Sequence, residues 1–354
     1  DLFDTAADEV LFFVNSQAHS LRDGIIADQN LVQGGQLLFL KGTREFNTVS
    51  PAQIVGLDGW ETSQIFTVGE SINGYTPTGI FDGMGATKLN DGTVRFFVNS
   101  ELVADAGYPY TLANGAEITG ARIHFFDVDP TSRILEDGGL AYDRIVNRDG
   151  SDVTDASQLE FNGINRLCSG ALFEAGQYGL ENTIMFSGEE TGGGTEFLLD
   201  VATNTLYAAP WLGRAAWESI TLLDSGDPDK IALIVGDDRQ GAPLLLYIGE
   251  KGAVGDGSFL DNNGFAQGKL YVWVANNATS PEDYNGTGNT MGGSFVEIAH
   301  YDPAGGAGYD ALGFATQDKQ DELAAAVGAF QFSRPEDVAT NPANATQFVM
   351  ASTG

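Results

Sequence analysis

The sequence contains the pentapeptide Phe-Phe-Val-Asn-Ser twice, at Phe12–Ser16 and at Phe96–Ser100. Because chance identity over a whole pentapeptide is improbable, the two copies indicate an internal structural repeat. The second copy follows the turn signal Asn90-Asp91-Gly92 and is followed at once by an acid, Glu101. This order predicts a tight turn, then a short strand, then a carboxylate at the strand end.

The same order of turn residues, β-prone residues and a polar or acidic end recurs elsewhere in the chain. The further segments are Leu180–Glu190, Gly226–Asp238, Gln267–Asn277 and Asn341–Thr353, which brings the total to six. Short strands repeated radially hide the edges of their sheets, as in a β-propeller. We therefore predict an all-β fold, a single six-bladed β-propeller over residues 1–354. A sandwich or a pair of β domains is the alternative.

The length and the glycine content of the chain are consistent with a fold of many short strands joined by turns. Glycine supplies 46 of 354 residues and is spread between short apolar runs. Compact propeller blades take about 40–50 residues, so six blades leave a surplus that we assign to loop insertions at Tyr142–Gln158 and Ser280–Met291. Acids followed by strong helix formers predict one short helix over Asp318–Phe330. Because the chain begins with Asp1 rather than Met, we expect a product processed or truncated at both ends.

The charge balance excludes several classes of function. Seventeen Lys and Arg residues oppose 49 Asp and Glu residues, so the net charge is -32. A nucleic-acid binder or a membrane-surface protein needs a basic footprint, which this chain lacks. Its apolar runs are shorter than the roughly 20 residues of a membrane-spanning helix. The acidity favours an exported protein, secreted, periplasmic or at the cell surface, and the sequence gives no indication of oligomeric state.

Acidic residues at the strand ends are the main chemical signal. In a propeller, equivalent points of the blades face one end of the central channel, so these carboxylates would converge. Clustered carboxylates repel one another unless cations bridge them, and hard oxygen ligands select calcium or magnesium. Solvated turn acids are the alternative. The predicted ligands are Glu101, Glu189, Glu190, Asp237 and Asp238. Since successive side chains of a strand point to opposite faces, at most one of each adjacent pair should contact an ion directly.

Cys168 and two arginines could add to this chemistry. A lone cysteine is usually a small apolar residue, but a thiolate beside carboxylates favours a softer ion such as iron or zinc. Arg214 precedes Glu218, and Arg334 precedes Glu336, each just before a strand segment. A guanidinium there could hold an oxyanion substrate or could form a salt bridge that braces the strand.

Other catalytic patterns are absent from the sequence. The three histidines, His19, His124 and His300, lie far apart and lack the spacing of a zinc site. No nucleophile elbow, phosphate-binding loop or dinucleotide fingerprint is present.

From about Tyr75 onward, the order of motifs resembles the PhoX-type alkaline phosphatase family. The motifs that carry the resemblance are Asn99-Ser-Glu101, Cys168-Ser-Gly170, Glu189-Glu190, Gly213-Arg214 with Trp217-Glu218, Gly236-Asp-Asp238 and Arg334-Pro-Glu336. The resemblance implies an exported propeller phosphomonoesterase that acts on small phosphate esters at a cluster of iron and calcium in its channel.

Residue by residue, the resemblance implies two roles. The metal ligands would be Cys168, Glu189 or Glu190, Glu218 and Glu336, and the phosphate holders Arg214 and Arg334. The reaction implied is metal-assisted hydrolysis, in which the ions neutralise the phosphate.

Two other readings stay open. Ser100 and Trp217 stand where the family has histidine, which favours a non-catalytic, calcium-stabilised propeller with a structural or adhesive role at the cell surface. A propeller hydrolase of the phytase or lactonase kind would keep the acids but would have no use for Cys168.

Overall fold

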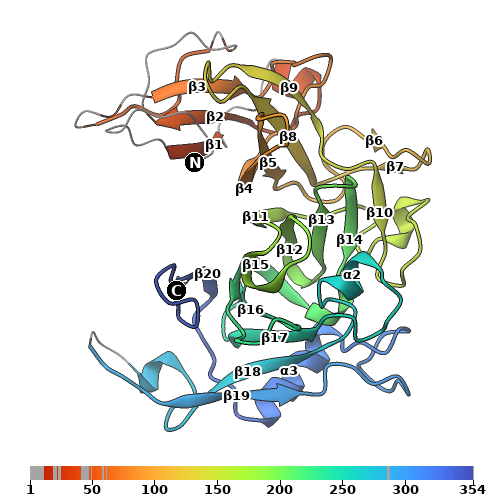
Figure 1. The fold of residues 1–354 in the computed structure, drawn as a ribbon, viewed down its shortest axis with the longest axis vertical. Coiled ribbons are helices and arrows are strands. Elements are labelled where there is room, and N and C mark those ends of the chain that lie inside the picture. The colour runs from red at the N-terminus through yellow and green to blue at the C-terminus, as the bar shows by residue number, and fades with distance from the viewer. Residues whose placement is uncertain are drawn as a thin grey trace. The chain divides into compact units, whose positions relative to one another are not determined.

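β-Strands dominate the computed structural model of the protein (Figure 1). The structure describes residues 12–18, 22, 25–40, 48, 50–57, 60, 62–284 and 288–353. The chain forms two compact units, one of Asp1–Arg144 with Val153–Leu172 and one of Ile145–Asp152 with Phe173–Gly354. Among the described residues, no helix has the length and apolar character needed to cross a membrane.

The first unit is built on two antiparallel sheets. One has the order β1 (Phe12–Ala18), β2 (Gly34–Leu40), β3 (Thr62–Thr67), and the other the order β4 (Phe81–Lys88), β5 (Val94–Ser100), β8 (Arg122–Val128), β9 (Leu135–Leu140). The unit also holds α1 (Ile25–Asp28), the short hairpin of β6 (Tyr110–Thr111) and β7 (Glu117–Ile118), a 3₁₀ turn at Ala156–Gln158 and most of β11 (Leu167–Phe173).

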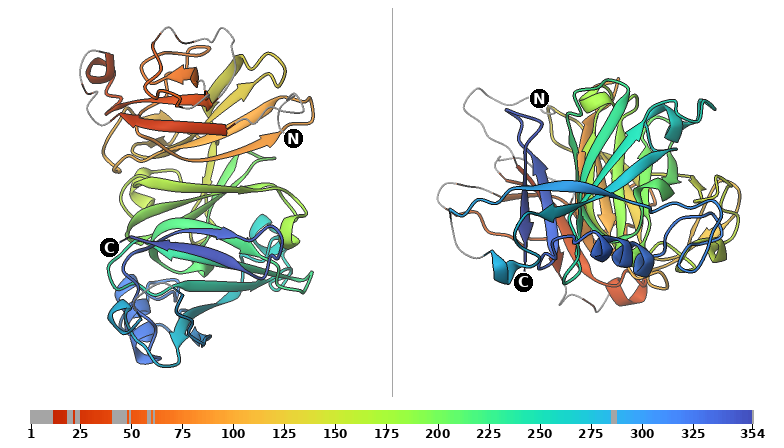
Figure 2. Two further views of the ribbon diagram at one scale, coloured as in Figure 1. Left: turned by 90° about the vertical axis from the view of Figure 1, so that its left-hand side faces the viewer. Right: turned by 90° about the horizontal axis from the view of Figure 1, so that it is seen from below.

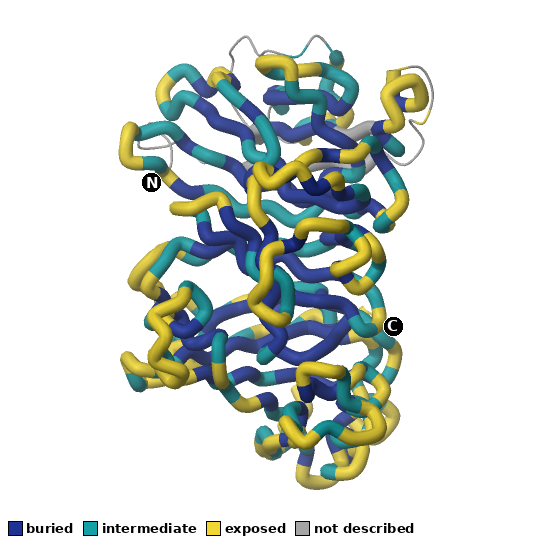
Figure 3. The backbone as a smooth tube through the Cα atoms, turned by 90° about the vertical axis from the view of Figure 1, so that its right-hand side faces the viewer, coloured by how far each residue is buried: buried dark blue, intermediate teal, exposed yellow. Residues whose placement is uncertain are grey.

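The core of this unit is formed by apolar side chains at alternate positions along its strands. Val94, Phe96 and Val98 on β5 share one face and join a single buried cluster, as side chains two residues apart on a strand do. Phe66 from β3 enters the same cluster, so the apolar faces of the two sheets cover each other. Figure 3 shows the buried residues in dark blue mainly along the strands, and the connecting turns mostly in yellow or teal.

The second unit contains the longest sheet. Its strand order is β10 (Arg144–Val146), β14 (Thr205–Ala208), β13 (Glu196–Asp200), β12 (Ile184–Gly194), β15 (Ala215–Leu223), β16 (Lys230–Asp237), β17 (Leu245–Glu250), β18 (Gly268–Ala275), β19 (Gly293–Ile298). From β15 to β19 each strand pairs antiparallel with the next one in sequence. Alternating residues of β15, β16, β17 and β18 point into one core around the fully buried Trp217.

A hairpin near the C-terminus packs on this sheet. It consists of β20 (Pro335–Thr340) and β21 (Phe348–Ser352), seen as the dark blue strands in Figure 2. β20 lies against β15 and β16. At the contact, a Cβ atom on Gly236 would lie 2.1 Å from the carbonyl oxygen of Glu336, so only glycine allows this approach.

The helix predicted over Asp318–Phe330 is present, but it ends four residues before its predicted limit. α3 spans Gln317–Ala326, and the Thr316 hydroxyl caps it by accepting a hydrogen bond from the Lys319 N–H. It ends because Gly328 adopts a φ of +77°, a left-handed conformation that terminates helices. The prediction of one helix is incomplete, because α1 and α2 (Phe259–Asn262) are also helical.

The prediction of an all-β fold with few helices is confirmed, whereas the closed six-bladed propeller is not. The sheets formed by the described residues do not close on themselves, and a single propeller domain remains our proposal. The predicted strands that end at Ser100 and Asp237 are confirmed. The predicted strand end at Glu190 is wrong, because β12 continues through a bulge to Gly194.

Both predicted insertions are poor in strand. Tyr142–Gln158 contains the short β10 and a 3₁₀ turn. Ser280–Met291 contains a 3₁₀ turn at Pro281–Asp283, and residues 285–287 of this segment lie outside the described part of the chain.

Candidate functional site

In the second unit, Arg334 lies among carboxylates from three segments. Its Nε and Nη2 each donate a 2.7 Å hydrogen bond to one oxygen of Asp238, the residue that follows β16. Nη2 also lies 3.2 Å from Oε1 of Glu336 on β20. The Arg334 side chain is 46% exposed, whereas that of Asp238 is 5% exposed. One edge of the guanidinium is therefore fixed on a buried carboxylate while the group stays accessible to solvent.

Glu190 on β12 belongs to the same cluster. Hydrogen bonds and charge from Asp238, then the charges of Glu336 and Glu190, raise the pKa of Arg334. Burial opposes ionisation of Asp238, but hydrogen bonds with Arg334, Glu190 and Glu336 and the charge of Arg334 together hold the pKa of Asp238 below its ordinary value. The cluster thus brings three carboxyl groups to one guanidinium.

The two glutamates in sequence on β12 differ in environment, as strand alternation predicts. Glu190 is half-buried, whereas Glu189 is buried and its Oε2 accepts a hydrogen bond from the Thr195 N–H at 3.0 Å. Beside it, burial raises the pKa of Glu196 well above its ordinary value, and the charge of Glu189 adds to this effect. Glu190 is therefore the better placed of the pair to meet a ligand from solvent.

Asp237 is held by a different set of contacts. Its Oδ1 accepts hydrogen bonds from the Ala216 N–H at 3.0 Å and from Arg239 Nε at 2.9 Å, and its Oδ2 accepts one from Arg239 Nη2 at 2.7 Å. Burial raises the pKa of Asp237, although Arg239 opposes this shift. Arg239 also donates to both oxygens of Asp321 on α3, each at 2.8 Å. Both oxygens of Asp237 are thus engaged within the protein.

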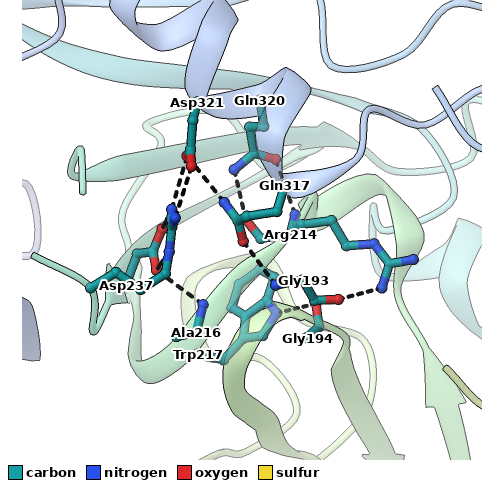
Figure 4. Close-up of polar contacts among 10 residues, drawn as sticks. Gly193, Gly194, Arg214, Ala216, Trp217, Asp237, Gln317, Gln320 and Asp321 are labelled. Atoms are coloured by element: carbon teal, nitrogen blue, oxygen red, sulfur yellow. Dashed lines mark hydrogen bonds and ion pairs between the residues drawn. The ribbon is translucent and has the colours of Figure 1, made fainter. Parts of the chain in front are cut away.

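Arg214 is buried immediately before β15, and Figure 4 shows it beside Gly193 and Gly194 at the end of β12. Its Nη1 donates to the carbonyl oxygen of Gly193 at 2.7 Å and to the Thr195 hydroxyl at 3.2 Å. Glu218, on the same strand, is half-buried. The Arg214 side chain is therefore fixed on Gly193 and Thr195, where β12 leads into β13.

A second group of possible ligands lies within the first unit. Asp82 on β4, Glu101 after β5 and Cys168 on β11 each offer a ligand atom, and these atoms lie within 4.8 Å of one another. The Cys168 thiol donates to Oδ2 of Asp82 at 3.2 Å. Arg166 donates to Oε1 of Glu101 through Nε at 3.0 Å and Nη2 at 2.6 Å.

Close backbone contact brings Asp82 and Cys168 together. β4 bulges at Asp82 and Gly83. A Cβ atom on Gly83 would lie 2.0 Å from the Gly170 nitrogen and 2.2 Å from the Ser169 carbonyl carbon, so this position requires glycine. The Asn99 side chain on β5 donates a hydrogen bond to the Ser169 carbonyl oxygen on β11 at 2.8 Å. β11 is therefore held by β5 as well as by β4.

The donor atoms of both groups fit the ions that the sequence implies. Glu190, Asp238 and Glu336 offer only carboxylate oxygens, which suit calcium. Asp82, Glu101 and Cys168 add a sulfur atom, which suits a softer ion such as iron.

The predicted residues divide between the two units, and Glu101 and Cys168 belong to the first. Those in the second unit are Glu189, Glu190, Arg214, Glu218, Asp237, Asp238, Arg334 and Glu336. Sequence reasoning missed Asp82, Arg239 and Asp321. The scarcity of arginine could have pointed to Arg239, which directly follows the two predicted aspartates, but no local signal marks the other two.

Comparison with known proteins agrees with the predicted resemblance. "Pseudomonas fluorescens PhoX in complex with vanadate, a transition state analogue" is a similar solved structure, with a TM-score of 0.47 and 16% identity over 75% of this chain. This chain covers 57% of the length of that PhoX chain. No curated protein is similar enough to this chain to be matched. Residues 200–354 match the family model described as alkaline phosphatase PhoX, which confirms the resemblance over this part of the chain.

Proposed function

We propose that this protein is an exported, metal-dependent phosphomonoesterase that hydrolyses small phosphate esters. The observation that carries the proposal is the Arg334 cluster. A partly exposed guanidinium lies beside the carboxylates of Asp238 and Glu336, all three within the residues matched by the PhoX family model. A phosphate ester needs both a cation to hold its oxygens and a means of neutralising its charge, and this cluster offers the residues for both.

In this proposal, the carboxylates of Glu190, Asp238 and Glu336 hold calcium, and Asp82, Glu101 and Cys168 hold iron. Glu189, Glu218 and Asp237 remain predicted ligands. When bound, the ions would act as Lewis acids and would neutralise the charge that develops on the phosphate.

The arginines bind and orient the substrate. Arg334 has a free path to solvent, and its planar fork matches two phosphate oxygens. Asp238 and Glu336 orient this fork. Arg214 supplies a second guanidinium in addition to that of Arg334, and its hydrogen bonds to Gly193 and Thr195 fix its position. The acidic surface of the protein fits export into surroundings that contain calcium and salt.

The direct test combines metal content with turnover. Elemental mass spectrometry of the purified protein should find calcium and iron, and a chromogenic phosphomonoester should be hydrolysed when calcium is present. Arg334→Ala should lose most of this activity, whereas Lys269→Ala, which breaks an exposed ion pair with Glu297, should keep it. Calcium without turnover would contradict the proposal and favour a structural, calcium-stabilised protein.

A further inference from the structure

Helix α3 presents three polar side chains to the β12–β15 region. Gln317 and Gln320 are three residues apart and Asp321 follows, so the three side chains share one side of the helix. Figure 4 shows Gln320 beside Arg214, Gln317 beside Gly193 and Asp321 on the side of Asp237. None of the three was expected from the sequence to contribute to a site.

Gln320 forms a two-point contact with the backbone of Arg214. Its Oε1 accepts a hydrogen bond from the Arg214 N–H at 3.0 Å, and its Nε2 donates to the Arg214 carbonyl oxygen at 2.7 Å. Gln320 is only 1% exposed. A Cβ atom on Gly213, which has a φ of +90°, would lie 2.5 Å from Oε1, so the chain approaches the carboxamide closely. The side chain thus satisfies both polar groups of a buried backbone residue.

Gln317 contacts the end of strand β12 at Gly193. Its Oε1 accepts a hydrogen bond from the Gly193 N–H at 3.1 Å, and its Nε2 donates to Asp321 at 3.2 Å. Gly193 is the residue whose carbonyl oxygen accepts from Arg214. The backbone of Arg214 and the group that fixes its guanidinium are therefore both bonded to one helix.

Asp321 provides a third connection. It accepts two hydrogen bonds from Arg239, which in turn holds Asp237, and Asp237 accepts from the Ala216 N–H. The helix is thereby tied to the strand residue two positions after Arg214. Three separate contacts from a rigid helix fix position and orientation, which a single contact does not.

We propose that α3 positions Arg214 for phosphate, with Gln320 as the main positioning residue. This inference rests on the proposed function for the role of Arg214. Loss of the carboxamide leaves two buried backbone groups of Arg214 without partners, so the strand start shifts and the guanidinium moves with it. Displacements of this kind, at a group that binds substrate, weaken binding and transition-state stabilisation.

The test compares Gln320→Met with the wild type. Methionine keeps the side-chain length and helix propensity but cannot form either hydrogen bond. We expect the KM for a chromogenic phosphomonoester to rise about tenfold or more, with a smaller change in kcat. Amide hydrogen exchange at Arg214, whose N–H donates to Gln320, should become faster. Gln320→Ala is the second variant, and Glu322→Gln is the matched control, because Glu322 lies on α3 with an exposed side chain that accepts a hydrogen bond from Lys319.

The two readouts separate this inference from the proposed function. If the wild type has no phosphatase activity, the proposed function fails, and unchanged or faster exchange at the Arg214 amide still decides whether Gln320 holds it. Unchanged exchange in folded Gln320→Met overturns the inference. Faster exchange with an unchanged KM in an active enzyme also overturns it, because Arg214 then moves without consequence for the substrate.

Discussion

Arg334 and Asp238 form a two-point ion pair in which Nε and Nη2 of the arginine each contact a separate carboxylate oxygen at 2.7 Å. The two residues are 96 positions apart in the sequence. The pair joins the start of β20 to the end of β16, where Gly236 admits the β20 backbone. A single pair of side chains thus links the hairpin at the C-terminus to the main sheet and shapes the cluster that we propose binds phosphate.

Replacing Arg334 with lysine separates charge from geometry. Lysine keeps the positive charge but cannot form the planar two-point contact with Asp238 or with a phosphate. We therefore expect Arg334→Lys to raise the KM for a phosphomonoester by about tenfold or more. The unfolding midpoint should change less, because lysine keeps a positive charge beside the buried Asp238 carboxylate and the Arg334 side chain is 46% exposed. Steady-state kinetics and thermal unfolding check both parts, and a normal KM would exclude Arg334 as a phosphate holder.

Cys168→Ser tests the softer metal site. The thiol donates to Asp82 at 3.2 Å, and serine preserves this hydrogen bond at similar size while it removes the sulfur ligand. We expect the variant to lose iron but to retain calcium, because calcium prefers oxygen ligands. Elemental mass spectrometry of both proteins gives the answer. Iron retained at the wild-type ratio would assign Cys168 a packing role only.

Removal of calcium should affect the Arg334 cluster first. Without a cation, Glu190, Asp238 and Glu336 keep a net negative charge that the single guanidinium does not cancel, so they repel one another. We expect a chelator to lower the unfolding midpoint and to abolish hydrolysis, with both restored by calcium but not by sodium at equal ionic strength. An unchanged midpoint after complete calcium removal, verified by elemental analysis, would show that these carboxylates do not depend on the ion.

Local sequence patterns predicted those strands whose ends are set by turn chemistry. Asn90-Asp91-Gly92 forms the turn between β4 and β5, with Gly92 at a φ of +95°, and the strand ends at Ser100 as expected. The sequence pattern of Leu180–Glu190 predicts a strand that ends at Glu190, before the Gly192–Gly194 run. In the structure this run continues β12, because a Cβ atom on Gly194 would lie 2.2 Å from the Glu189 carbonyl oxygen and glycine alone fits the bulge.

Only the site residues that belong to recognisable sequence motifs could be predicted. Asp238 and Arg334 were singled out by their motifs, and the structure brings them together. Asp82 contacts Cys168 across 86 residues, and Asp321 contacts Arg239 across 82. Such pairs depend on how strands and the helix pack, which local patterns do not encode.

Gly83→Ala should damage the Cys168 group through the backbone. The added Cβ would lie 2.0 Å from the Gly170 nitrogen, and neither strand can yield without losing the contact. We expect a loss of about 1–3 kcal/mol in unfolding free energy, as for overpacked sites, together with weaker iron binding. Gly192→Ala is the control, because the nearest atom to its Cβ is 3.9 Å away. Equal effects of the two substitutions on denaturant unfolding would contradict the close contact.

His300 should make the second unit less stable in acid. Burial lowers its pKa to about 4, although the Trp211 carbonyl oxygen, 3.1 Å from Nε2, opposes this shift. The unfolded chain binds a proton near pH 6.5 and the folded protein does not, so stability falls as the pH drops from about 6.5 to about 4. The full effect over this window is about 3 kcal/mol. His300→Gln keeps a donor for Trp211 and removes the titration. Denaturant unfolding at pH 7 and pH 4.5 should therefore show a smaller loss in the variant than in the wild type, and equal losses would mean that His300 is protonated in the folded protein.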